Sequence, residues 1–208
     1  MYGQMVIKAG TGKPHEARRA ADFFASRHAR YLDGALLCSP ERVGTDQGMI
    51  LIAGDEAVWS ANQPVLRCLS SNIKFTGPQI DTAKLLDFAY LSQRLGTFIG
   101  ALQGVLLCQA GGLDAETFAA TVAADARTAQ LARVVQQASF DVPVNSVEAW
   151  AAGMEQLIGQ AHESGANAEV LEFFGALIER ANADGLGKED FAAVIKVISR
   201  TFRNPAHD

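Results

Sequence analysis

The chain has 208 residues, of which 49% are apolar and 20% charged, and its formal net charge is −5. This length suffices for one large or two small domains with a buried core, and the composition excludes disordered, low-complexity and collagen-like proteins. The negative charge excludes a basic nucleic-acid-binding surface of the usual kind, because phosphate backbones are bound by clustered Lys and Arg.

Membrane, secretory and metal-binding classes are also disfavoured. The most apolar stretch, residues 88–110, contains Arg94 and several Gln, whereas a spanning helix needs about 20 nearly uncharged residues. The N-terminus lacks the basic and apolar regions of a secretory signal, so we expect a cytoplasmic protein without a membrane partner. The three cysteines form no C-x-x-C pair and the four histidines show no ligand spacing, which predicts neither a disulfide framework nor a metal site.

Residues 1–78 predict an α/β segment. Short apolar runs alternate with helical patterns, as βαβ units require, and Pro14 suits the first turn of a helix. The predicted strands cover about 5–7, 31–37, 49–54 and 73–77, and the predicted helices about 14–28 and 56–69.

Residues 79–208 predict an all-α segment. Helical periodicity continues from Pro78 to Pro143 without an intervening proline. The predicted helices cover about 81–110, 114–138, 146–162, 168–183 and 188–201. The first of these is long and carries Gly96, Gly100 and Gly104 on one face, where the missing side chains allow another helix to approach closely.

A glycine turn, Gly10-Thr11-Gly12, separates the first predicted strand from the first helix and resembles a nucleotide-binding loop. A P-loop is excluded because Ile7 and Pro14 stand where it needs Gly and Ser or Thr. The dinucleotide fingerprint is incomplete because His15 replaces its third glycine, although Asp33 lies at the distance of a ribose-binding carboxylate. Backbone N–H groups that face a ligand stay plausible at such a turn.

Lys84 and Asp87 lie three residues apart near the start of the long helix, which leaves two alternatives open. They form a solvated ion pair worth a few tenths of a kcal/mol, as most such surface pairs do. Otherwise one of them is a proton donor beside a cleft, with a pKa shifted by burial.

Several segments occur in an order that is informative as a set: 31–35, 43–45, 50–54, the helix that begins at about Asp81, 177–181, 185–187 and 191–195. This order is similar to that of the β-hydroxyacid dehydrogenase superfamily, closest to its imine reductase and reductive aminase branch. The resemblance implies an α/β plus all-α fold, in which a partial Rossmann-like sheet is joined by a long interdomain helix to a helical 6-phosphogluconate-dehydrogenase-like C-terminal domain. It also implies an NADP(H) cofactor, a small-molecule substrate and a homodimer that exchanges helical domains.

The resemblance also implies roles for particular residues. Gly10-Thr11-Gly12-Lys13-Pro14 is similar to the S-T-x-x-P loop near the nicotinamide ribose, so Thr11 and Gly12 are candidate cofactor contacts. Lys84 matches the catalytic lysine of the K-x-x-N-N helix in the hydroxyacid branch. Asp87 matches the aspartate of the L-Y-D motif in the imine-reducing branch, which implies a proton donor or an anchor for an iminium ion. Leu37 stands where the hydroxyacid branch has a carboxylate-binding serine, which favours the imine-reducing branch.

In the family, the G-x-G-x-x-G turn precedes the segment that this sequence matches. We therefore expect a truncated relative whose cofactor binding is weakened, since that turn supplies the N–H contacts to the phosphates. The expected function is NADPH-dependent hydride transfer to a C=N or C=O carbon. The alternative is a non-catalytic dimeric scaffold that has lost cofactor binding.

Overall fold

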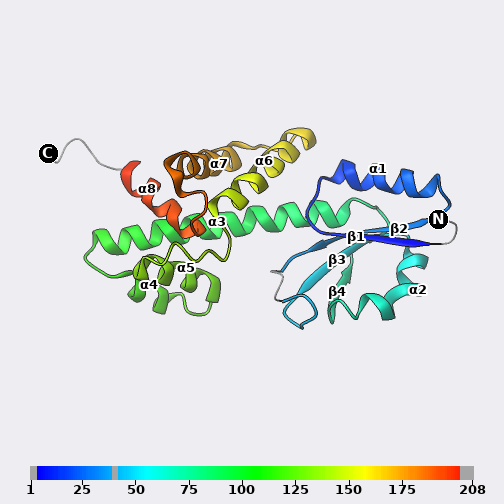
Figure 1. Cartoon of the computed structure of the whole chain (residues 1–208), viewed down its shortest axis with the longest axis horizontal. Helices are drawn as coiled ribbons and strands as arrows, with labels where there is room; N and C mark the ends of the chain where they lie inside the picture. Colours follow the sequence, from blue (N-terminus) through cyan, green and yellow to red (C-terminus); the bar gives the residue numbers. More distant parts are fainter. Residues whose placement is uncertain (1–3, 39–41, 202–208) are drawn as a thin grey trace. The chain divides into compact units, whose positions relative to one another are not determined.

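A computed structural model describes residues 4–38 and 42–201 of the chain (Figure 1). The chain forms two compact units, Met1–Leu91 and Ser92–Asp208. The division falls inside helix α3 (Thr82–Ala110), whereas the sequence predicts a domain boundary before this helix, between residues 78 and 79. The boundary between residues 78 and 79 stays a prediction.

The first unit is built on a four-stranded sheet with the order β1-β2-β3-β4. Its elements are β1 (Met5–Ala9), α1 (Pro14–Ala25), β2 (Arg30–Leu36), β3 (Met49–Gly54), α2 (Glu56–Leu66) and β4 (Asn72–Phe75). The predicted alternation of strands and helices is confirmed. The pairs β1–β2 and β3–β4 are parallel, as βαβ units require, but β2 and β3 pair in antiparallel fashion, from Leu32 opposite Gly54 to Leu36 opposite Ile50.

The two faces of this sheet are covered by different helices, and α1 and α2 lie on opposite sides of it (Figure 1). On the α2 face the core is formed by Leu32, Ile50, Ile52, Val58, Trp59 and Leu66. On the other face Ala35 and Leu51 pack against Ala83 at the start of α3, while the Phe24 ring of α1 stacks on Tyr31 with ring centroids 5.1 Å apart. Because side chains alternate along a strand, Tyr31, Asp33 and Ala35 share this second face.

The first unit's helices begin where their caps predict and end earlier than expected. Pro14 occupies the first turn of α1, and the Asp55 carboxylate caps α2 by accepting a hydrogen bond from the Val58 N–H at 2.9 Å. Helix α1 was expected to reach His28, but it ends at Ala25 and His28 adopts a φ of 54°. A residue in the left-handed conformation cannot continue a right-handed helix, so the chain leaves the helical path here, and strand β2 begins at Arg30.

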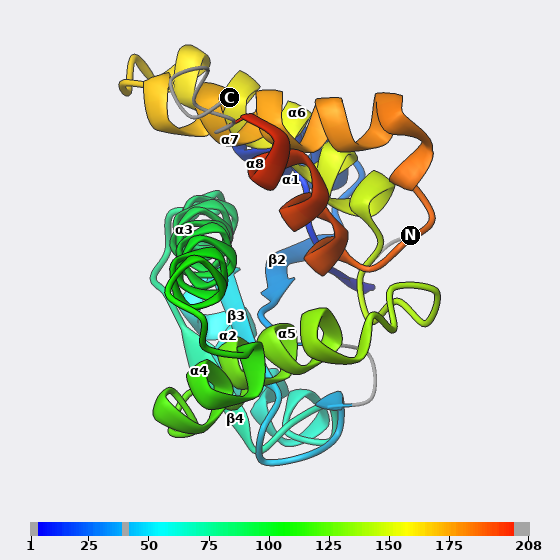
Figure 2. The ribbon, with the colours of Figure 1, turned by 90° about the vertical axis from the view of Figure 1, so that its left-hand side faces the viewer.

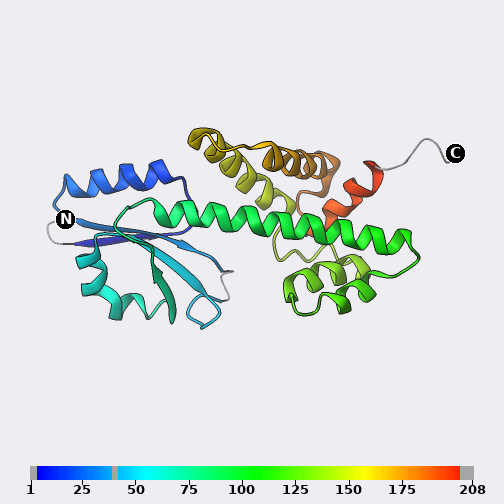
Figure 3. The ribbon, with the colours of Figure 1, turned by 180° about the vertical axis from the view of Figure 1, so that it is seen from behind.

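The second unit is helical throughout, as predicted. Beyond α3 its elements are α4 (Ala115–Thr121), α5 (Ala126–Gln137), α6 (Val147–Ser164), α7 (Glu169–Ala181), η2 (Asn182–Leu186), η3 (Phe191–Val194) and α8 (Ile195–Thr201). Within this unit α4 packs against α5 and α6 packs against α7 (Figures 2 and 3). None of the helices in residues 4–38 and 42–201 combines the length and hydropathy needed to cross a membrane.

Two predicted helix spans in this unit are wrong. The single helix expected over 114–138 is two helices, because Asp125 accepts hydrogen bonds from the Thr128 hydroxyl and backbone N–H and so caps a new helix. The helix expected from residue 188 begins at Phe191, where Asp190 caps a 3₁₀ turn by accepting the Ala192 N–H.

The glycine face of α3 has two different environments. A Cβ atom at Gly104 would lie 2.8 Å from the Phe118 ring of α4, so the predicted close approach is confirmed there, although an aromatic ring makes it and not a helix backbone. A Cβ atom at Gly100 would meet nothing within 4 Å, and one at Gly96 would only touch Phe174 at 4.0 Å. At these two positions the structure leaves open space beside α3.

Candidate active site

The candidate site lies in the first unit, where strands β1 and β2 end and α3 begins. The loop Gly10–Gly12 directly follows β1, and Gly34 and Leu36 mark the end of β2, which runs parallel to β1. Ligands of open α/β sheets bind outside the carboxyl ends of parallel strands, because loops and helix starts meet there. Both candidate catalytic residues, Lys84 and Asp87, lie on the first turns of α3.

Asp87 is a buried carboxylate that is only partly bound by the protein. It is 2% exposed, and its Oδ2 atom has no hydrogen-bond partner among the described residues. Burial raises the pKa of Asp87 to about 6, while a hydrogen bond from the Thr11 side chain and the positive charge of Lys84 act in the opposite direction. A carboxyl group with this pKa exists in both protonation states near neutral pH, as a general acid requires.

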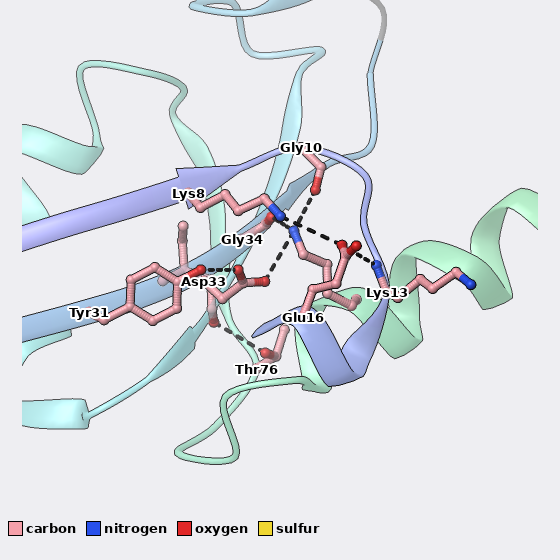
Figure 4. A network of polar contacts seen from close by, with 10 residues as sticks. Lys8, Gly10, Lys13, Glu16, Tyr31, Asp33, Gly34 and Thr76 are labelled. Atoms are coloured by element: carbon pink, nitrogen blue, oxygen red, sulfur yellow. Dashed lines mark hydrogen bonds and ion pairs between the residues drawn. The ribbon is translucent and has the colours of Figure 1, made fainter. Parts of the chain in front are cut away.

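Lys84 is fully buried, and its ammonium group is surrounded by protein oxygen atoms. Its Nζ atom donates hydrogen bonds to the carbonyl oxygens of Gly10 and Gly34, the latter at 2.5 Å, and lies 3.0 Å from Oδ2 of Asp33. Figure 4 labels these three oxygen-bearing residues. The Tyr31 hydroxyl donates a hydrogen bond to Oδ1 of Asp33 at 2.6 Å. Burial, together with the bond and charge of Asp33, raises the pKa of Tyr31 well above its ordinary value, so its hydroxyl stays a donor.

These contacts decide between the two alternatives for Lys84 and Asp87. The prediction that Lys84 and Asp87 form a solvated ion pair is wrong, because both side chains are buried and Lys84 forms its ion pair with Asp33. The idea that Asp33 could bind a ribose is also wrong, since its side chain is fully buried. The buried carboxylate of the second alternative is present at Asp87.

The candidate cofactor residues Thr11 and Gly12 lie in the loop between β1 and α1. Thr11 is exposed and reaches Asp87, whereas Gly12 is buried. A Cβ atom at Gly12 would lie 3.1 Å from Oε2 of Glu16 and 3.2 Å from Nζ of Lys8. Glu16 also accepts the Lys13 N–H at 3.1 Å, so it occupies a backbone donor that could otherwise face a ligand (Figure 4).

Sequence reasoning missed Tyr31 and Asp81 at this site and assigned Asp33 a different role. Asp81, which is 3% exposed, binds the Arg18 guanidinium of α1 and accepts a hydrogen bond from Gln79 at 2.9 Å. Tyr31 and Asp33 carried a usable signal, because polar side chains two positions apart in a strand point to the same face. No sequence pattern predicts the contact between Asp33 and Lys84, because the two residues lie far apart in the sequence.

Comparisons with known proteins show which family this chain resembles. Residues 79–200 match the family described as NADPH-dependent reductive aminase-like, C-terminal domain. An NADPH-dependent reductive aminase from Aspergillus oryzae is 28% identical over 201 residues, which cover 92% of this chain and 68% of that protein. An imine reductase from Myxococcus stipitatus, solved in complex with NADP+, is 25% identical with a TM-score of 0.56, over 95% of this chain and 71% of that one.

The fold extends to the hydroxyacid branch. A 3-hydroxyisobutyrate dehydrogenase from Salmonella typhimurium has a TM-score of 0.82 at 17% identity, over 95% of this chain and 70% of that one, and this likeness concerns the fold alone. The expected combination of a partial Rossmann-like sheet and a helical C-terminal domain is therefore confirmed. Because the match covers more than half of its residues, this chain belongs to the NADPH-dependent reductive aminase-like family of oxidoreductases.

Proposed function

We propose that this protein takes part in NADPH-dependent hydride transfer to a C=N carbon of a small molecule, with Asp87 as the group that protonates or anchors the substrate nitrogen. The observation that carries this proposal is the buried Oδ2 atom of Asp87, which no described residue binds. An unpaired buried carboxylate is costly to a fold, so a partner supplied by a ligand gives a reason for its presence.

Asp87 can act in either of two protonation states. As a carboxylic acid it donates a proton to an imine nitrogen, which makes the adjacent carbon a better hydride acceptor. As a carboxylate it pairs with an iminium cation that is already protonated, and its burial strengthens that pairing. The pKa of about 6 makes both states accessible, and the hydrogen bond from Thr11 favours the carboxylate form.

The described residues fit the nicotinamide half of a dinucleotide better than its phosphate half. Thr11 offers an exposed hydroxyl beside Asp87, and Gly12 keeps the loop free of a side chain. The 208 residues contain no G-x-G-x-x-G turn, so we expect weak cofactor binding by this chain alone. NADPH, where it binds, supplies the hydride.

Two observations favour a C=N substrate over a hydroxy acid. The Lys84 ammonium is enclosed by protein oxygens and is not exposed, so it does not offer a free catalytic amine. Leu37 provides no hydroxyl for a substrate carboxylate, and its backbone N–H bonds to the carbonyl of Met49 at 2.9 Å.

We also propose a homodimer that exchanges helical domains, as the resemblance implies. In the second unit a cavity of about 360 Å³ opens beside α3, and its lining includes Gly96, Gly100, Phe173, Phe174 and Ile198. Phe173 is 59% exposed, although large aromatic side chains are usually covered. A helix from a second copy would fill the space left by the two glycines and cover this ring.

The proposed function is tested by NADPH binding and by the Asp87→Asn variant. We expect saturable NADPH fluorescence enhancement and reduction of a cyclic imine, with kcat lowered about 10²- to 10⁴-fold in Asp87→Asn, as is typical for loss of a general acid. Asp22→Asn, which changes an exposed carboxylate of the same unit, is the matched control and should leave kcat unchanged. Absence of NADPH binding at any practical concentration would favour the non-catalytic scaffold.

The pH profile separates the two roles of Asp87. If it donates a proton, turnover should fall as pH rises through about 6, because the acid form is lost. If it anchors a cation, turnover should instead rise through the same range and reach a plateau. An inflection that persists in Asp87→Asn would assign the titration to another group.

A further inference from the structure

Lys84 connects three segments of the first unit through one buried ammonium group. Its oxygen partners are the carbonyl of Gly10 in the loop after β1, the carbonyl of Gly34 in β2, and the carboxylate of Asp33 beside it. The Gly34 carbonyl also accepts the Gly10 N–H at 3.1 Å, so loop, strand and helix share one acceptor. The ammonium group uses two of its three N–H donors in the bonds to Gly10 and Gly34. Oδ2 of Asp33 lies 3.0 Å from Nζ as an ion-pair partner and accepts no hydrogen bond from the described residues.

We propose that Lys84 is a positioning residue and not the reacting amine: with Asp33 and Tyr31 it forms a buried polar chain that holds the loop Gly10–Gly12 against the first turns of α3, so that Thr11 meets Asp87. The assignment of a role in turnover rests on the proposed function, whereas the geometry and its effect on Asp87 do not.

The positions of these residues along the chain support the proposal. Thr11 follows directly after Gly10, whose carbonyl Lys84 binds, and Asp87 lies three residues after Lys84 on the same face of α3. The Lys84 ammonium group therefore links the residue before Thr11 to the helix turn that carries Asp87, and Thr11 and Asp87 are hydrogen-bonded to each other. The Asp33 carboxylate is fixed in turn by the Tyr31 hydroxyl at 2.6 Å.

Close packing keeps this chain in place. A Cβ atom at Gly34 would lie 2.7 Å from the Leu51 carbonyl oxygen, so this strand position accepts only glycine. Lys84 and Asp33 have fully buried side chains, and Tyr31 is 7% exposed, so the three side chains of this polar chain lie in the interior of the first unit. A buried ion pair of this kind is held by its hydrogen bonds, and the loss of one partner leaves an uncompensated charge.

The charges around Asp87 give the proposal a measurable signature. Lys84 faces it from its own helix, Asp33 lies behind Lys84 on β2, and Lys8 and Glu16 flank the loop at Gly12. The positive charge of Lys84 lowers the pKa of Asp87 against the effect of burial. Removal of Lys84 and removal of Asp33 should therefore move that pKa in opposite directions.

The experiment is a ¹³C NMR titration of the Asp87 carboxyl carbon in the full chain, with Asp87→Asn used to assign the resonance. In Lys84→Met the midpoint should rise from about 6 by roughly one unit or more, as expected for the loss of a nearby opposite charge. In Asp33→Asn, which leaves the ammonium group uncompensated, the midpoint should fall. An unchanged midpoint in both variants would overturn the proposal.

A further variant guards against a folding failure and separates the two roles of Lys84. The double variant Lys84→Met/Asp33→Asn removes both charges of the buried ion pair, so we expect it to fold even if Lys84→Met does not. Asp33→Asn alone still tests the direction in which the Asp87 midpoint moves. With imine substrate, the double variant should keep measurable kcat, lowered no more than about 10²-fold. Loss of turnover at every pH, with the Asp87 midpoint intact, would identify Lys84 as the reacting group. If the wild type shows no turnover, the proposed function fails and the NMR titration still decides this inference.

Discussion

At the scale of single residues, the site is distinguished by a carboxylate that the fold buries without fully binding. Asp33 and Asp81 are equally buried, but Asp33 is held by Lys84 and Tyr31, and Asp81 by Arg18 and Gln79. Among the described residues, Oδ2 of Asp87 accepts no hydrogen bond, and Thr11 is the side chain that bonds to this carboxyl group. Oδ2 of Asp33 also accepts no hydrogen bond, but the Lys84 ammonium lies 3.0 Å from it. This contrast within one unit supports the proposal that Asp87 serves the reaction, whereas Asp33 and Asp81 hold the structure together.

The raised pKa of Asp87 predicts a specific pH dependence of stability. A carboxyl group whose pKa is higher in the folded than in the unfolded chain binds protons more tightly when folded, so its stabilising contribution is complete below about 3.8 and is lost as pH rises through about 6. The shift of roughly two units corresponds to on the order of 3 kcal/mol. The free energy of unfolding of the wild type should therefore fall by this amount, relative to Asp87→Asn, between pH 4 and pH 7.

Urea denaturation at several pH values measures this difference, and Asp22→Asn again serves as the control. At pH 8 we expect Asp87→Asn to be at least as stable as the wild type, although its kcat is lowered. Parallel pH profiles for the wild type and Asp87→Asn would contradict the assignment of the raised pKa to Asp87.

Sequence reasoning reached Asp87 but not its surroundings. The three-residue spacing placed Lys84 and Asp87 on one helix face and suggested that they pair with each other, since spacing reports only contacts within the helix. In the structure the nearest acidic partner of Lys84 is Asp33, because the sheet brings β2 under the start of α3. Contacts between distant segments depend on the tertiary arrangement, which no local pattern encodes.

At the scale of elements, glycines and caps decide where helices end and what they contact. Apolar runs bounded by Gly and Pro were enough to place all four strands and the continuous α3. The antiparallel pairing of β2 with β3 was not predictable from alternation, because the same pattern suits either direction. The break at Asp125 was missed because periodicity continues across it, and only the capping hydrogen bonds reveal a new start.

Replacement of a glycine of α3 by alanine should change the stability of the chain in opposite directions at Gly104 and Gly100. Gly104→Ala would place a Cβ atom 2.8 Å from the Phe118 ring, and such overpacking costs about 1–3 kcal/mol. Gly100→Ala meets nothing within 4 Å in the single chain, so the better helix propensity of Ala should stabilise it by up to about 1 kcal/mol. Chemical denaturation of the two variants at low protein concentration measures both effects, and equal destabilisation would contradict this account of the glycine face.

At the scale of the whole molecule, the candidate active site and the apolar cavity lie in different units and can be tested separately. The site residues Thr11, Lys84 and Asp87 belong to the first unit, whereas the cavity beside α3 is lined entirely by the second. The contacts that fix Asp87 do not require the second unit, so its titration can be followed whatever the oligomeric state. The cavity, in contrast, bears on the proposed dimer, because it is lined by Gly96 and Gly100 and by the largely exposed Phe173.

The proposed dimer predicts that Phe173 matters for association and little for the fold of one chain. Phe173→Glu should raise the dimer dissociation constant about 30-fold or more, since aromatic side chains at the centre of an interface often contribute at least about 2 kcal/mol. Light scattering after size-exclusion chromatography, over a range of protein concentrations, measures this change. Val142→Glu alters a side chain that is 73% exposed and does not line the cavity, so it should leave the dissociation constant unchanged. A wild-type chain that stays monomeric at all concentrations, or a Phe173→Glu chain that dimerises as the wild type does, would show that a second copy does not cover this cavity.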